Sequence, residues 1–297
     1  MNTPAKLAAF AVGLVTAFGA AAGLGAIVGP VGPASADAPA EVGHGDRHEA
    51  VTDPAAADAG VLPAGLQISD DGYALDLLTE DAAAGPATPL SFRILGPDGE
   101  PVTGYEESHE QDLHLIVVRR DLAGFQHVHP TLATDGVWTT PLALAPGSWR
   151  VFADFVPGAD GKKRVLGADL AVAGDFVPSP LPAESRIAEV DGYTVTLDGE
   201  LSAGNETTLT FSVARDGRPV TDLQPYLGAY GHLVALRGGD LAYLHVHPAE
   251  GDAAAGVRFD TTAPSAGSYR LFLDFRHGDV VRTAAFPVSA AAHEETR

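Results

Sequence analysis

The sequence contains no cysteine, and its only methionine is Met1. The lack of cysteine excludes disulfides, thiolate metal ligands, a cysteine nucleophile and a lipid-modified N-terminal cysteine. Without Met1 the chain would also lack the soft sulfur ligands that select Cu(I). Any metal site must therefore be built from imidazole and carboxylate groups.

Positive charge is also scarce. The chain has 18 Lys and Arg against 39 Asp and Glu, which gives a net charge of −21 at pH 7. So acidic a protein is repelled by phosphate backbones and anionic lipid surfaces, and we expect no nucleic-acid partner. Cations, including metal ions, would be attracted to it.

Charged side chains are nearly absent from residues 1–36, where Lys6 is the only one. An uncharged run over 7–29 is followed by Ala-Ser-Ala at 34–36, which resembles a secretory signal with its cleavage site. The run is also long enough to serve as an uncleaved membrane anchor. Both alternatives predict an extracytoplasmic protein, secreted or membrane-anchored at the cell envelope.

Large apolar side chains are sparse over 37–65, so we expect a disordered tether there. Beyond it the chain repeats itself, most clearly in GSWRVFADF from Gly147 and GSYRLFLDF from Gly267. We predict a signal peptide or membrane anchor at 1–36 and a disordered tether at 37–65. The two β-sandwich repeats are predicted at 66–175 and 183–290, followed by a tail at 291–297.

Each repeat consists of short β-type runs separated by turn residues such as Pro97-Asp98-Gly99, and no segment after residue 36 shows a sustained helical period. A unit of about 110 residues has the size of an immunoglobulin-like sandwich. The predicted fold is all-β, with two tandem immunoglobulin-like β-sandwich domains.

The two repeats share one histidine pattern, His-x12-His-x-His-Pro. Its members are His114, His127 and His129 in the first repeat and His232, His245 and His247 in the second. Histidines two apart on a strand point to the same face. If the polar segment 119–124 closes a hairpin that pairs His114 opposite His127 or His129, three imidazoles converge. Such a group suits Zn(II) or Cu(II), and we predict one site in each repeat.

Two other interpretations of these histidines stay open. His114 shares its strand face with Ile116 and Val118, so the histidines could be structural and hydrogen-bonded within a non-catalytic adhesion or protein-interaction module. A metal-dependent enzyme is least favoured, because neither repeat offers a strong nucleophile or paired carboxylates.

Weaker signals accompany the histidines. Asp154 and Asp274 each follow an arginine by four residues, Arg150 and Arg270. Each aspartate could accept the ring N–H of a ligand histidine, although a local ion pair with the arginine is the favoured prediction. We expect the acidic run around His109 to be a charged loop, and a contribution of metal ligands from this run is the less favoured alternative.

The segments YLGAYGHLVAL from Tyr226, DLAYLHVHP from Asp240 and GSYRLFLDF from Gly267 resemble bacterial envelope proteins with YtkA-like or FixH-like immunoglobulin-type domains. Several of these are linked with heavy-metal, especially copper, handling. Together with the first-repeat counterpart the resemblance covers about a third of the chain. It implies a metal-sequestering or metal-delivering protein, with metal ions and envelope metal-transport proteins as partners.

Overall fold

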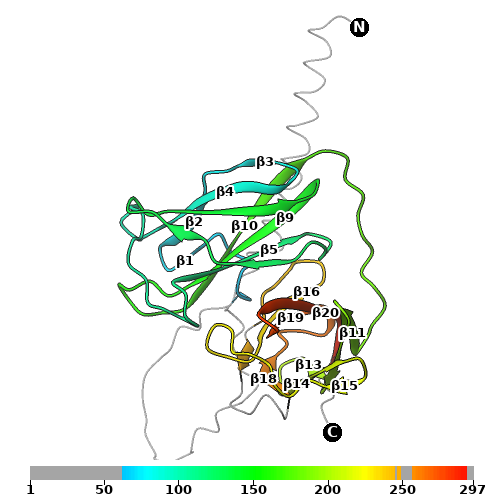
Figure 1. Ribbon diagram of the computed structural model, residues 1–297. Helices are drawn as coiled ribbons and strands as arrows, with labels where there is room; N and C mark the ends of the chain where they lie inside the picture. The colour runs from blue at the N-terminus through cyan, green and yellow to red at the C-terminus, as the bar shows by residue number, and fades with distance from the viewer. Residues whose placement is uncertain (1–61, 245, 249–255, 293–297) are drawn as a thin grey trace, which may run out of the picture. The chain divides into compact units, whose positions relative to one another are not determined.

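The computed structural model describes residues 62–244, 246–248 and 256–292. Within these residues the chain forms twenty strands and no helix, which confirms the all-β prediction (Figure 1). No helix that is long and apolar enough to cross a membrane occurs among them. The predicted signal peptide or anchor at 1–36 lies outside the described residues.

The first repeat consists of two five-stranded sheets. One has the order β1-β2-β4-β8-β7, with bounds Ser69–Asp70, Tyr73–Leu77, Gly85–Leu95, Val137–Leu144 and Thr131–Leu132. The other has the order β3-β10-β9-β5-β6, with bounds Asp81–Ala83, Arg164–Ala173, Gly147–Phe155, Leu113–Arg119 and Gln126–Val128. Of these pairs only β3 and β10 run parallel.

The second repeat has the same two-sheet plan. Its six-stranded sheet contains β11-β12-β14-β18-β17, with β15 paired to β14, and the bounds are Ile187–Val190, Tyr193–Asp198, Glu206–Arg215, Val257–Thr262, Val246–Pro248 and Arg218–Pro219. Its four-stranded sheet has the order β13-β20-β19-β16, with bounds Leu201–Ser202, Val280–Ala291, Gly267–His277 and His232–Arg237.

The strand order identifies both repeats as immunoglobulin-like. In such domains one sheet has the order A-B-E-D and the other contains C, F and G. Strands β2-β4-β8-β7 and β12-β14-β18-β17 follow the first order, and β5-β9-β10 and β16-β19-β20 follow the second. The predicted fold class, two tandem immunoglobulin-like sandwiches, is therefore confirmed.

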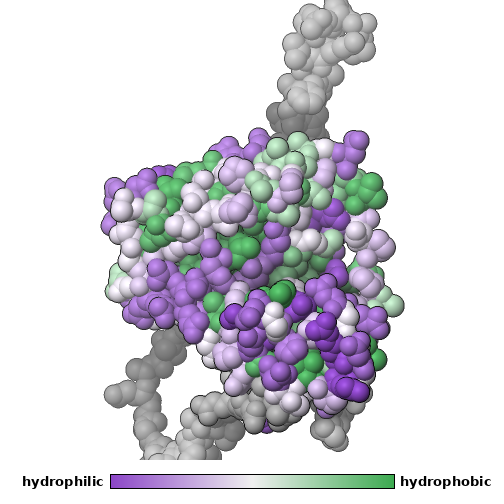
Figure 2. Space-filling view, in the orientation of Figure 1, coloured by the Kyte–Doolittle hydropathy of each residue, from purple (hydrophilic) through white to green (hydrophobic). Residues whose placement is uncertain are grey.

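Each sandwich buries its own core. The first is built around Phe92, Trp149 and Phe155, and the second around Phe211 and Tyr269, all at most 1% exposed. Strand β8 shows how the sequence produces this packing, because every second residue is buried along most of its length. In the view of Figure 2 hydrophilic and hydrophobic residues are interspersed over the surface.

A third apolar cluster joins the two repeats. It contains Ile116, Val118, Leu122 and Phe152 from the first repeat and Val234, Leu236, Leu241 and Phe272 from the second. Phe125 stacks on Phe272 with a centroid distance of 4.0 Å, and Phe152 contacts Tyr243 at 5.7 Å. Strand β5 is consequently buried on both faces, which explains its unbroken apolar run from Leu115 to Val118.

Candidate metal centre

The first histidine group lies on the hairpin of β5 and β6, as predicted. His114 is on β5, His127 is on β6, and His129 follows directly after β6. The antiparallel register places Ile116 opposite His127, so His114 and His127 project from the same face of the sheet. Gly124 in the connecting turn has a φ of 66° and packs on the ring of Trp149, where a Cβ would clash at 2.5 Å. Only glycine fits this turn without strain.

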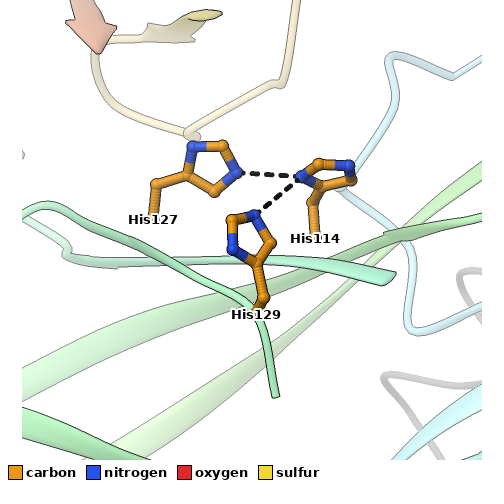
Figure 3. Close-up of side chains that lie close together, drawn as sticks. All are labelled: His114, His127 and His129. Carbon is orange, nitrogen blue, oxygen red and sulfur yellow. Dashed lines mark hydrogen bonds between the residues drawn. The ribbon is translucent and has the colours of Figure 1, made fainter. Parts of the chain in front are cut away.

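Three imidazole nitrogens converge at this hairpin (Figure 3). Nδ1 of His114 lies 3.0 Å from Nε2 of His127 and 3.2 Å from Nε2 of His129. One ligand atom from each ring lies within 4.8 Å of the other two. A tetrahedral ion with metal–nitrogen bonds of about 2.0–2.1 Å separates its ligand nitrogens by roughly 3.3 Å. The rings are therefore already close to the spacing of a metal site.

Hydrogen-bond partners on the outer side of two rings assign their protons. Nδ1 of His127 is 2.8 Å from Oδ2 of Asp274, and Nε2 of His114 is 2.9 Å from the carbonyl oxygen of Ser108. A carboxylate and a carbonyl oxygen accept, so both of these ring nitrogens carry the proton. When both rings are neutral, the facing nitrogens, 3.0 Å apart, each hold a lone pair, which is the form in which imidazole ligates a metal ion.

Burial keeps the rings of His114 and His129 in the neutral form that ligates metal ions. Loss of solvation lowers the pKa of His114 to about 3 and that of His129 to about 4, and neighbouring histidines act in the same direction. At neutral pH neither ring has to release a proton before it binds an ion.

A histidine of the second repeat lies beside this group. The ring of His232, at the start of β16, is 6.4 Å from that of His114 and 6.2 Å from that of His127. Its Nε2 is 2.9 Å from the carbonyl oxygen of Tyr226. A cavity of about 70 Å³ lies against these rings, and its polar lining consists mainly of His109, His114, His127, Asp154, Lys163 and His232.

The other two predicted ligands of the second repeat, His245 and the side chain of His247, lie outside the described part of the structure. The backbone of His247 belongs to β17 and pairs with Asp260 on β18. Of the six predicted ligands the structure therefore brings together His114, His127 and His129, with His232 next to them.

The favoured pairing of Arg150 with Asp154 is wrong. Arg150 binds Asp169 and the carbonyl oxygens of residues 65 and 66, while Asp154 pairs with Lys163 at 3.2 Å. Residues i and i+4 on a strand lie about 13 Å apart, too far for a direct contact. In line with the less favoured alternative, Asp274 accepts the ring N–H of His127, one of the predicted ligands.

Sequence reasoning missed His109. It lies in the loop between β4 and β5 with a φ of 50°, and its ring is 6.0 Å from that of His114 and 5.2 Å from that of His232. The acidic run around it suggested a solvated loop. Its position five residues before His114 was the available signal, and the second repeat offers no counterpart.

The fold and this cluster define the class of the chain as a tandem immunoglobulin-like β-sandwich protein with a histidine centre beside the contact between its repeats. Both repeats match the family described as Domain of unknown function (DUF8832), at residues 67–174 and 188–292. The chain belongs to this family. No curated protein matches the sequence.

Several solved structures share distant similarity with the chain. The Escherichia coli adhesin FdeC is 17% identical over 76% of this chain and 65% of its own, with a TM-score of 0.24. Domains 4–9 of the surface layer protein SbsC are 14% identical over 75% of this chain and 31% of their own, with a TM-score of 0.24. The fibronectin(III)-like modules of CbhA from Clostridium thermocellum are 9% identical over 75% of this chain and 97% of their own, with a TM-score of 0.23. Similarities this low carry no information about function.

Proposed function

We propose that this protein is an extracytoplasmic metal-binding protein that holds Cu(II) or Zn(II) through His114, His127 and His129. The observation that carries the proposal is the convergence of three imidazole nitrogens, with Nδ1 of His114 3.0 Å from Nε2 of His127 and 3.2 Å from Nε2 of His129. Three imidazoles that converge in this way form a ligand set suited to such an ion.

The composition narrows the choice of ion. Because the chain has no cysteine and no methionine beyond Met1, the centre offers only nitrogen and oxygen ligands. Imidazole groups suit Zn(II) and Cu(II), and Cu(II) binds tightest among divalent ions at an unconstrained nitrogen site. Three protein ligands also leave a fourth position for water or for a donor group of a partner.

An open fourth position fits sequestration or delivery of the ion. A donor group of a partner protein can bind the ion at this fourth position before the three histidines dissociate from it. Envelope metal-transport proteins are the expected partners. For the second repeat the sequence alone predicts a site at His232, His245 and His247. The secretory or anchoring segment predicted at residues 1–36 supports a location at the cell envelope.

Calorimetric titration of the full chain with Cu(II) and with Zn(II) tests the proposal. We expect stoichiometric binding to the wild type and loss of one equivalent in the double variant His127→Ala/His129→Ala. His277→Ala is the matched control, because His277 pairs with Tyr193 and Asp222 in the second repeat and lies outside the cluster. Absence of stoichiometric binding to the wild type overturns the proposal.

A further inference from the structure

Equivalent histidines of the two repeats converge on one place. His114 and His232 occupy matching positions at the starts of β5 and β16, and their rings lie 6.4 Å apart with an interplanar angle of 26°. Ile116 and Val234, two residues further along each strand, belong to the same apolar cluster. The faces that carry the histidines are therefore packed on each other.

His232 has an unprotonated ring nitrogen, Nδ1, that can ligate an ion. Its Nε2 donates to the carbonyl oxygen of Tyr226 at 2.9 Å, so Nδ1 is the unprotonated nitrogen of the neutral ring. Burial lowers the pKa of His232 to about 4 and also lowers that of His109. The rings of His109 and His232 are 5.2 Å apart, and both line the cavity.

A buried carboxylate lies on the wall of the same cavity. Asp154 is 7% exposed, and its Oδ2 pairs with Nζ of Lys163 at 3.2 Å. The Lys163 side chain is 40% exposed, so its ammonium group can move into solvent when another cation takes its place. The cavity of about 70 Å³ has room for an ion and a few waters, because one water needs roughly 10–15 Å³ of such volume.

We propose that this cavity, in place of the separate second-repeat site predicted from the sequence, holds a second divalent transition-metal ion, bound by His109 and His232 beside the first ion. Asp154 supplies the negative charge that Lys163 neutralises when the ion is absent. The inference rests on the proposed function, because the first ion occupies His114, His127 and His129. It makes the centre a two-ion site assembled from both repeats.

Titration of the full chain with Cu(II), followed by electron paramagnetic resonance, tests the inference. The first equivalent gives the spectrum of an isolated Cu(II) ion. The second equivalent produces dipolar broadening and a half-field signal, because two spins in adjoining sites couple magnetically. His109→Ala and His232→Ala each lose the second equivalent and the coupling, and keep the first.

The substitution Lys163→Gln should raise the affinity of the second site for its ion, whereas the histidine substitutions abolish binding there. Removing the competing ammonium group tightens binding of the second ion and leaves the first unchanged. Lys162→Gln, a neighbouring exposed lysine, is the matched control and changes neither. A gain of affinity is not expected from structural damage, so this variant remains informative even where a histidine variant fails to fold.

Three results overturn the inference. Saturation of the wild type at one ion is the first, and a second ion without magnetic coupling is the second. The third is a second ion that survives His109→Ala but is lost in His247→Ala, which would place it in the second repeat alone. Binding of no ion at all contradicts the proposed function itself and is distinguished by the absence of any Cu(II) protein spectrum.

Discussion

Asp274 on β19 accepts a hydrogen bond from Nδ1 of His127 on β6 over 2.8 Å, and the two side chains are each 5% exposed. The other oxygen of the carboxylate accepts from Oγ1 of Thr283 at 2.6 Å. A carboxylate of the second repeat therefore orients His127, a proposed ligand in the first repeat, and the geometry of the histidine group depends on both repeats.

Asp274→Asn should weaken binding of the first ion by about 10–100-fold without changing its stoichiometry. Such losses are typical when the partner that orients a metal-binding histidine is removed. Isothermal titration with Zn(II) measures the change. Asp222→Asn, which alters the partially exposed pair of Asp222 and His277, is the control and should leave the affinity unchanged. Equal affinities of Asp274→Asn and wild type would exclude the orienting role.

Metal binding should raise thermal stability. An ion at a free concentration 100 times its dissociation constant raises the free energy of unfolding by about 2.7 kcal/mol, provided that it does not bind the unfolded chain. Calorimetric melting with Zn(II) and with a chelator measures this difference, which should vanish in His127→Ala/His129→Ala. If the histidines are only structural, as in the adhesion interpretation, wild type melts at one temperature under both conditions.

The metal-free protein should lose stability as the pH falls below about 6.5. The pKa values of His114, His129 and His232 are lowered to about 3, 4 and 4, so between these values and 6.5 the unfolded chain binds more protons than the folded one. The stability that these neutral rings contribute is complete above pH 6.5 and is lost progressively towards pH 3.

Urea unfolding at several pH values between 7.5 and 4.5 measures this slope. His129→Gln removes one titrating group and should flatten it. Asp154 acts in the opposite sense, because burial raises its pKa and its contribution is lost as the pH rises, so the comparison with the variant isolates the histidine. Equal slopes in wild type and variant would contradict the prediction.

The apolar contact between the repeats should couple their unfolding. Phe272 is 3% exposed and stacks on Phe125 at 4.0 Å. Phe272→Ala should cost about 3–5 kcal/mol, as is typical of buried aromatic truncations. Differential scanning calorimetry should show one transition for the wild type and two for the variant. Val281→Ala, at a partly exposed position, is the control, and a single unshifted transition in Phe272→Ala would show that the repeats are not coupled there.

Much of the fold follows from local patterns in the sequence. Alternation of buried and exposed residues in β8, turn residues between runs and the 118 to 120 residue repeat predicted tandem sandwiches. The spacing of His114, His127 and His129 also predicted their shared face, because a hairpin with a short turn leaves few registers. These features depend on neighbours that are near in sequence or paired in one hairpin.

The contacts across the repeats could not be predicted in the same way. His127 and Asp274 are 147 residues apart, and no pattern within one repeat shows which outer sheet face will be covered by the other. The double burial of β5 was visible only as a continuous apolar run, which a buried single-sheet strand also has. His109 lies in the cluster because its backbone adopts a left-handed conformation, and the acidic sequence around it did not indicate that conformation.

Anomalous diffraction from crystals grown with Zn(II) tests the central claim most directly. The account predicts an anomalous peak about 2.0–2.1 Å from Nδ1 of His114 and from Nε2 of His127 and His129. Nδ1 of His127 should still donate to Asp274. Absence of a peak among these three nitrogens, at a Zn(II) concentration that saturates the protein in solution, would contradict the account.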